Sequence, residues 1–134
     1  MLVRRSFLTT LTSLLLPALP PALLSIVVTG AGAVPPPHEQ TRIERLIAFI
    51  ESQKNMKFIR NGTEYSCADA AKFLRGKMDS MGGEVRSARE FIDRIASKSS
   101  MSGEPYQVRF ADGKTMLASE FLAEELKRME GRPA

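Results

Sequence analysis

The first 33 residues have the layout of an export signal that is removed from the mature protein. Arg4 and Arg5 precede a long apolar stretch, and residues 31–33, Ala-Gly-Ala, match the small-residue pattern at which such signals are cleaved. We therefore expect residues 1–33 to be absent from the folded protein. The remainder suffices for one small domain, which buries only about 60–70% of the surface of its chain.

The sequence of residues 1–33 does not decide which export route is used or whether the signal is cleaved. Uncleaved, the apolar stretch is about long enough to span a bilayer and would anchor the chain. Pro17, Pro20 and Pro21 interrupt it and favour cleavage. Residues 4–8, RRSFL, are similar to a twin-arginine signal, so twin-arginine and general secretory export are both compatible with the sequence. Either route predicts a periplasmic location, with membrane contact only through an uncleaved signal.

Composition excludes several classes of function. The 19 basic residues include Arg4 and Arg5, which leaves 17 against 15 acidic residues in the remainder. Both signs are interleaved there, which is typical of an ordinary surface, and we expect no nucleic-acid partner. One histidine, His38, and no P-loop or dinucleotide-binding glycine pattern lead us to expect no metal and no cofactor. The sequence gives no indication of the oligomeric state.

We expect a single domain over residues 41–131, behind a Pro-rich and flexible lead-in at residues 34–40. Thr41 and Glu44 match a capping box, in which a helix starts at Thr41. Apolar residues at helical spacing behind it predict a helix over about 39–54.

The dipeptide Asn61-Gly62 predicts a β-hairpin, because both positions of a type I′ turn need positive φ. In the implied register, Phe58 faces Tyr65 across the hairpin. Strict alternation of apolar and polar residues over 106–110, YQVRF, predicts a further half-buried strand.

Three more helices are expected. Ser66 is a good N-cap for a helix whose apolar stripe runs from Cys67 to Met81, and Ser87 begins a second capping box. The last helix extends over about 117–129. The fold class is therefore α+β: a small antiparallel sheet, made of a hairpin and one or two further strands, packed with about four helices.

Cys67 is the only cysteine, so the domain has no internal disulfide. A helix N-terminus lowers a thiol pKa, so Cys67 is a weak candidate for catalysis or redox chemistry. Intermolecular disulfide formation is another alternative. Against both, Cys67 lies on an apolar stripe and no general base is near it in sequence, which favours a core residue.

Two groups of polar residues suggest binding. Hydroxyls cluster in the loop over residues 97–105, where they either close the turn or contact a ligand. The second group is a possible anion site, with scattered surface charge as the alternative. Its members are Arg60, Arg75, Lys77 and Arg109.

Four stretches carry a family resemblance: residues 58–62 (FIRNG), Tyr65, residues 74–77 (LRGK) and residues 99–106 (SSMSGEPY). Together they resemble the YfeK-like family of small proteins exported by Gram-negative bacteria. The similarity extends over Ile43–Met129. It implies a periplasmic address and a shared fold, and it implies no activity.

We therefore expect a non-catalytic binding or accessory module that contacts an envelope protein or a cell-wall component. The alternative is a thiol-dependent redox or transfer enzyme that uses Cys67. The expected contact surface combines the hairpin with the serine-rich loop. The candidate binding residues are Arg60, Asn61, Tyr65, Arg75, Ser99, Ser100, Ser102 and Tyr106.

Overall fold

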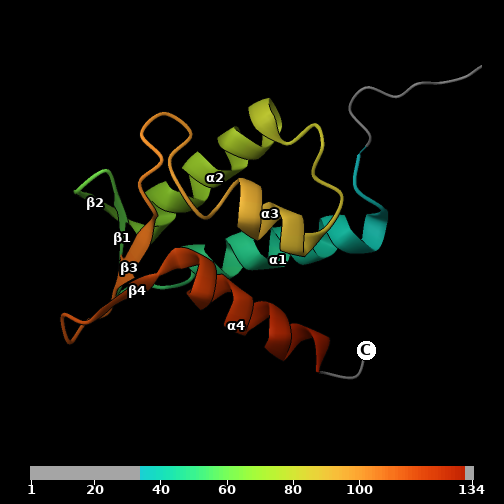
Figure 1. Cartoon of the computed structure of the whole chain (residues 1–134). Coiled ribbons are helices and arrows are strands. Elements are labelled where there is room, and N and C mark those ends of the chain that lie inside the picture. Colours follow the sequence, from blue (N-terminus) through green and yellow to red (C-terminus); the bar gives the residue numbers. More distant parts are fainter. Residues whose placement is uncertain (1–33, 132–134) are drawn as a thin grey trace, which may run out of the picture.

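The computed structural model describes residues 34–131, so the export signal predicted at residues 1–33 lies outside the described part. In that part, none of the helices combines the length and the apolarity needed to cross a membrane. Figure 1 shows helices gathered to one side of a small sheet. In chain order the elements are α1 (Pro37–Glu51), β1 (Lys57–Arg60), β2 (Thr63–Ser66), α2 (Cys67–Met81), α3 (Ala88–Arg94), β3 (Gln107–Arg109), β4 (Thr115–Leu117) and α4 (Ala118–Glu130).

The sheet is antiparallel, with strand order β2-β1-β3-β4. The predicted hairpin is confirmed, including its register: Phe58 on β1 faces Tyr65 on β2. Asn61 and Gly62 have φ of 48° and 78°, as a type I′ turn requires. On its other edge β1 pairs with β3, where Phe58 faces Val108. The α+β class with an antiparallel sheet is therefore confirmed.

The core lies between the inner face of this sheet and the helices. α1 contacts each of the other three helices, which places it at the centre of the helical layer. Its buried side chains have the predicted helical spacing, because positions three and four apart share a helix face. The largest fully buried side chains are Tyr106, Phe58, Phe91, Leu46, Ile47, Ile50, Leu74, Ile92, Ile95, Leu122, Val85 and Val108.

The predicted start of the first helix is wrong. α1 begins at Pro37, and Thr41 lies inside it, where its hydroxyl donates to the Pro37 carbonyl at 3.1 Å. Proline suits a first helical position because it needs no N–H partner there. The Glu39 carboxylate also accepts a hydrogen bond from the Ala88 amide at 2.7 Å, which ties this first turn to α3. Residues 37–40 of the predicted flexible lead-in are therefore helical.

The other helix starts are confirmed or shifted by one residue. The Ser66 hydroxyl accepts from the Asp69 amide, and that of Ser87 accepts from the Glu90 amide, both at 3.1 Å. Leu117, which was expected in the last helix, is the final residue of β4. Strand β4 shows no strict alternation, because the apolar residues Met116 and Leu117 are adjacent in the sequence.

Candidate functional site

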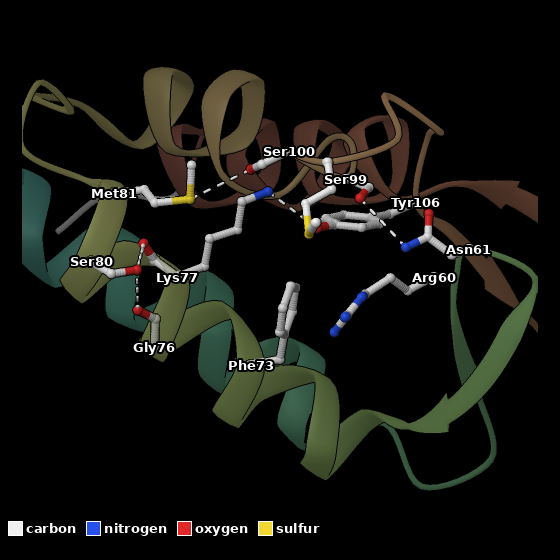
Figure 2. A pocket seen from close by; sticks show the side chains of 11 residues that line it. Arg60, Asn61, Phe73, Gly76, Lys77, Ser80, Met81, Ser99, Ser100 and Tyr106 are labelled. Atoms are coloured by element: carbon white, nitrogen blue, oxygen red, sulfur yellow. Dashed lines mark hydrogen bonds between the residues drawn. The ribbon is translucent and has the colours of Figure 1, made fainter.

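A pocket of about 410 Å³ opens between α2, the β1–β2 turn and the serine loop, defined here as residues 97–105 (Figure 2). Its size falls in the range of small-molecule sites, which are mostly apolar with a few polar groups. The lining side chains come from segments far apart in the sequence. They belong to Arg60, Asn61, Phe73, Gly76, Lys77, Ser80, Met81, Ser99, Ser100, Met101 and Tyr106.

Lys77 reaches the pocket from the middle of α2 and is only 6% exposed. Its ammonium donates to the Lys98 carbonyl at 2.8 Å and to the Tyr106 hydroxyl at 3.1 Å. It also lies 5.0 Å from the centre of the Tyr106 ring, at cation–π distance. An ammonium has three N–H donors, so these contacts use two of them.

Arg60 enters from the opposite side, at the end of β1 (Figure 2). Strand alternation puts Arg60 on the same face as the buried Phe58 and directs it toward the helices. Its guanidinium carbon lies 4.2 Å from the centre of the Phe73 ring and 5.8 Å from that of Tyr65. A planar guanidinium is well suited to such stacking, which leaves its edge free for hydrogen bonds.

The pocket carries uncompensated positive charge within the described part of the chain. No carboxylate lines it, and none of the ion pairs among residues 34–131 involves Arg60 or Lys77. Burial lowers the pKa of Lys77, and the positive charge of Arg60 lowers it further. Burial raises the pKa of Tyr106, so the phenol is neutral at physiological pH.

The hairpin turn holds the serine loop in place. The Ser102 hydroxyl donates to the Asn61 side-chain oxygen at 2.6 Å, and the Asn61 amide donates to the Ser99 hydroxyl at 3.5 Å. Ser99 is only 5% exposed, and its backbone N–H donates to the Glu104 carbonyl at 2.9 Å. The loop is therefore a hydrogen-bonded wall of the pocket.

The structure brings most of the predicted binding residues together. Tyr65 lines a smaller adjoining hollow of about 260 Å³ that shares Arg60 and Phe73 with the pocket. Ser102 supports the wall through Asn61 without lining the pocket. The predicted residues that line the pocket itself are Arg60, Asn61, Ser99, Ser100 and Tyr106.

The four-member cation group suggested by the sequence does not assemble. Arg75 lies on another face of α2, where it pairs with Glu51 at 3.0 Å and Glu44 at 3.6 Å. Arg109 pairs with Glu64 across the sheet at 2.5 Å. Scattered surface charge is the correct description of these two arginines, and only Arg60 and Lys77 reach the pocket.

Sequence reasoning named Lys77 of α2 only as a member of a possible cation group, and it missed the other α2 residues and the methionines that line the pocket. Phe73, Lys77 and Ser80 follow helical spacing, so they form a second face of α2 beside its apolar stripe. Met81 was expected on that stripe, but it is 54% exposed beside the pocket. Met101 is 97% exposed, and nothing in the sequence of the polar loop around it indicated that it lies beside a pocket.

Cys67 is a core residue, as favoured above. It is 2% exposed, and its thiol donates to the Met56 carbonyl at 3.5 Å. Burial raises the pKa of Cys67 and outweighs the opposite effect of Lys57. A buried, protonated thiol is a poor nucleophile. Among residues 34–131, no three His, Cys, Asp or Glu side chains are grouped closely enough to hold a metal ion.

The fold and the pocket define a small α+β domain, and comparison with known proteins places it in a family. The model described as "Family of unknown function (DUF5329)" matches residues 37–130, and the chain belongs to this family. It is also 36% identical over 69 residues to "Uncharacterized protein YfeK" of Salmonella typhimurium, which confirms the YfeK-like resemblance. That match covers 52% of this chain and 58% of the relative, so the chain spans less than two thirds of it. No solved structure matches the chain.

Proposed function

We propose that this protein is a non-catalytic binding or accessory module of the bacterial cell envelope. In this proposal it is exported to the periplasm, where its pocket takes up part of an envelope protein or a cell-wall component. The observation that carries the proposal is the pair of cations, Arg60 and Lys77, in a concave site to which residues 34–131 contribute no carboxylate. Export is supported by the arginines, apolar stretch and cleavage pattern of residues 1–33.

Binding is a better account of this pocket than catalysis. A nucleophilic hydroxyl needs a base within hydrogen-bond reach, as in serine–histidine pairs. The lining hydroxyls of Ser80 and Ser100 instead donate to the Gly76 carbonyl and the Met81 sulfur, at 3.1 and 3.5 Å. These contacts hold side chains in place and activate none of them.

Site-directed photo-crosslinking tests the proposal. A benzophenone side chain replaces Met101, which is exposed beside the pocket, and in a control protein it replaces the exposed Glu124 on α4. We expect crosslinks to a defined envelope component from position 101 only, and their loss when Arg60→Gln is added. Equal crosslinks from both positions, or none from position 101, contradict the proposal.

Cell fractionation with N-terminal sequencing tests the location. We expect the protein in the periplasmic fraction, with a new N-terminus at Val34. A chain that retains Met1 and stays with membranes after a salt wash contradicts cleavage. In that case the protein is an anchored accessory of the membrane.

A further inference from the structure

Arg60 and Lys77 create a local excess of charge that the described part of the chain does not balance. Lys77 is nearly fully buried, and burying an ammonium without an opposite charge costs free energy. Arg60 lies close enough to disfavour the charged form of Lys77 further. An anion between these side chains would relieve both effects, because opposite charge nearby favours the charged form.

The surroundings of the two cations are apolar. The Phe73 ring lies between Arg60 and Lys77 on one side of the pocket, and the Tyr106 ring lies on the other (Figure 2). Met81 and Met101 add exposed thioether side chains, which adapt to ligands of different shape. A small, heavily hydrated ion would leave these surfaces unused.

We propose that the pocket binds an organic anion in which one carboxylate or phosphate is joined to a short apolar or aromatic segment. The anionic group lies between the Arg60 guanidinium and the third N–H of the Lys77 ammonium. The apolar segment lies against Tyr106 and the two methionines. This inference rests on the proposed function and names the chemical class of the group that the envelope component presents to the pocket.

The alternative explanation is that Lys77 has a purely structural role, in which case the pocket binds no anion. The two hydrogen bonds of Lys77 connect α2 to the serine loop and would do so in a protein that binds nothing. Arg60 distinguishes the structural role from anion binding. Its side chain contacts aromatic rings and forms no ion pair with the serine loop, so a purely structural role of Lys77 does not require Arg60. Binding that depends on Arg60 as well as Lys77 requires an anion at both.

NMR titration of the purified protein tests the inference with three probes of similar shape and one small anion. These are 4-phenylbutyrate, 4-phenylbutyl phosphate, the neutral alcohol 4-phenylbutan-1-ol, and acetate, which lacks the apolar segment. We expect the two amphipathic anions to shift the amide signals of Gly76, Ser80 and Met101. The alcohol and acetate should bind at least about tenfold more weakly, since each lacks one half of the recognition. The affinities of the two anions show whether the pocket prefers a carboxylate or a phosphate.

Variants complete the test. Arg60→Gln and Lys77→Met should each weaken 4-phenylbutyrate binding about tenfold or more, because each removes a charge-assisted hydrogen bond. Arg75→Gln removes an equal charge outside the pocket and should leave binding unchanged. The wild-type comparison of acid with alcohol needs no variant, so it remains decisive if Lys77→Met fails to fold.

Several results overturn the inference: equal binding of acid and alcohol, insensitivity to Arg60→Gln, or no shift of the pocket amides by any probe. The crosslinking experiment shows whether such a result contradicts only the organic-anion inference or the proposed binding function as well. If position 101 still captures an envelope component, the pocket binds it through other chemistry. If capture is lost as well, both proposals are wrong.

Discussion

The ammonium of Lys77 donates a hydrogen bond to the phenol oxygen of Tyr106, with 3.1 Å between the two atoms. The bond joins the middle of α2 to the residue just before β3, 29 positions further along the chain. Both side chains are buried, so water does not replace the bond when it is broken. The bond therefore connects two of the residues that line the pocket.

Removal of the Tyr106 hydroxyl should therefore destabilise the protein. We expect Tyr106→Phe to lower the free energy of unfolding by about 1–3 kcal/mol, because it leaves a buried donor with one partner fewer. Urea unfolding followed by circular dichroism measures this loss. Tyr65→Phe is the matched control: Tyr65 is only half-buried, and the change should stay within about 0.5 kcal/mol. Equal losses in the two variants would contradict the role of the bond.

Asn61 should be sensitive to substitution for two separable reasons. Its φ of 48° strains most side chains, and its amide oxygen accepts the 2.6 Å hydrogen bond from Ser102. We expect Asn61→Ala to cost about 1–3 kcal/mol of unfolding free energy, and Asn61→Gly distinctly less, since glycine adopts positive φ freely.

Ser102→Ala provides a control for Asn61, because it removes the 2.6 Å bond to Asn61 and leaves the residues of the turn unchanged, although the Glu104 amide also loses the Ser102 hydroxyl as an acceptor. Its loss in urea unfolding should be smaller than that of Asn61→Ala, because Ser102→Ala adds no strain at the positive φ of residue 61. An Asn61→Gly protein as unstable as Asn61→Ala would show that backbone strain contributes nothing at this turn.

The hairpin and the helix caps could be predicted because they depend on neighbours in sequence. Asn61-Gly62 fixes both the turn and the register, and Ser66 and Ser87 bond to amides three residues ahead. The start of α1 could be predicted this way only in part, from the suitability of proline at Pro37 for a first helical position. Its first turn is held by the Glu39–Ala88 hydrogen bond, whose partners are 49 residues apart.

The candidate site was predictable only in part for the same reason. The hairpin and the serine loop were correctly expected to act together, and the Asn61–Ser102 bond joins them across 41 residues. Nothing local distinguishes Lys77 from Arg75, since both are charged residues on α2. Lys77 is buried because its acceptors, Lys98 and Tyr106, come from distant segments, whereas Arg75 meets carboxylates of α1.

The thiol of Cys67 should resist alkylation in the folded protein. It is 2% exposed, and burial raises its pKa, so both access and the thiolate fraction are low. We expect iodoacetamide to modify it slowly near neutral pH, and rapidly after unfolding in urea, as measured by mass spectrometry. Fast modification of the folded protein that persists below about pH 7 would indicate a lowered pKa instead and would restore the thiol-enzyme alternative.

The burial of Lys77 should make stability depend on pH in a defined direction. Its pKa is lowered from the ordinary 10.5, first by burial and then by Arg60, and no carboxylate from the described part of the chain lines the pocket to oppose this. Between the lowered value and 10.5, the unfolded chain holds more protons at this site than the folded one. The free energy of unfolding contributed by Lys77 therefore rises with pH through that window.

Comparison of variants isolates this contribution. Urea unfolding at several pH values between about 7 and 10 should show the wild type gaining stability relative to Lys77→Met as pH rises. The raised pKa of Cys67 acts in the opposite direction, but this distant group is present in each protein and cancels in the difference. Tyr106 also acts in the opposite direction but contacts Lys77, so the comparison is made in a Tyr106→Phe background. Lys72→Met, which removes an exposed lysine of α2, should give a curve parallel to the wild type. Parallel curves for all three proteins would mean that Lys77 keeps an ordinary pKa, and that the pocket is more hydrated than its geometry indicates.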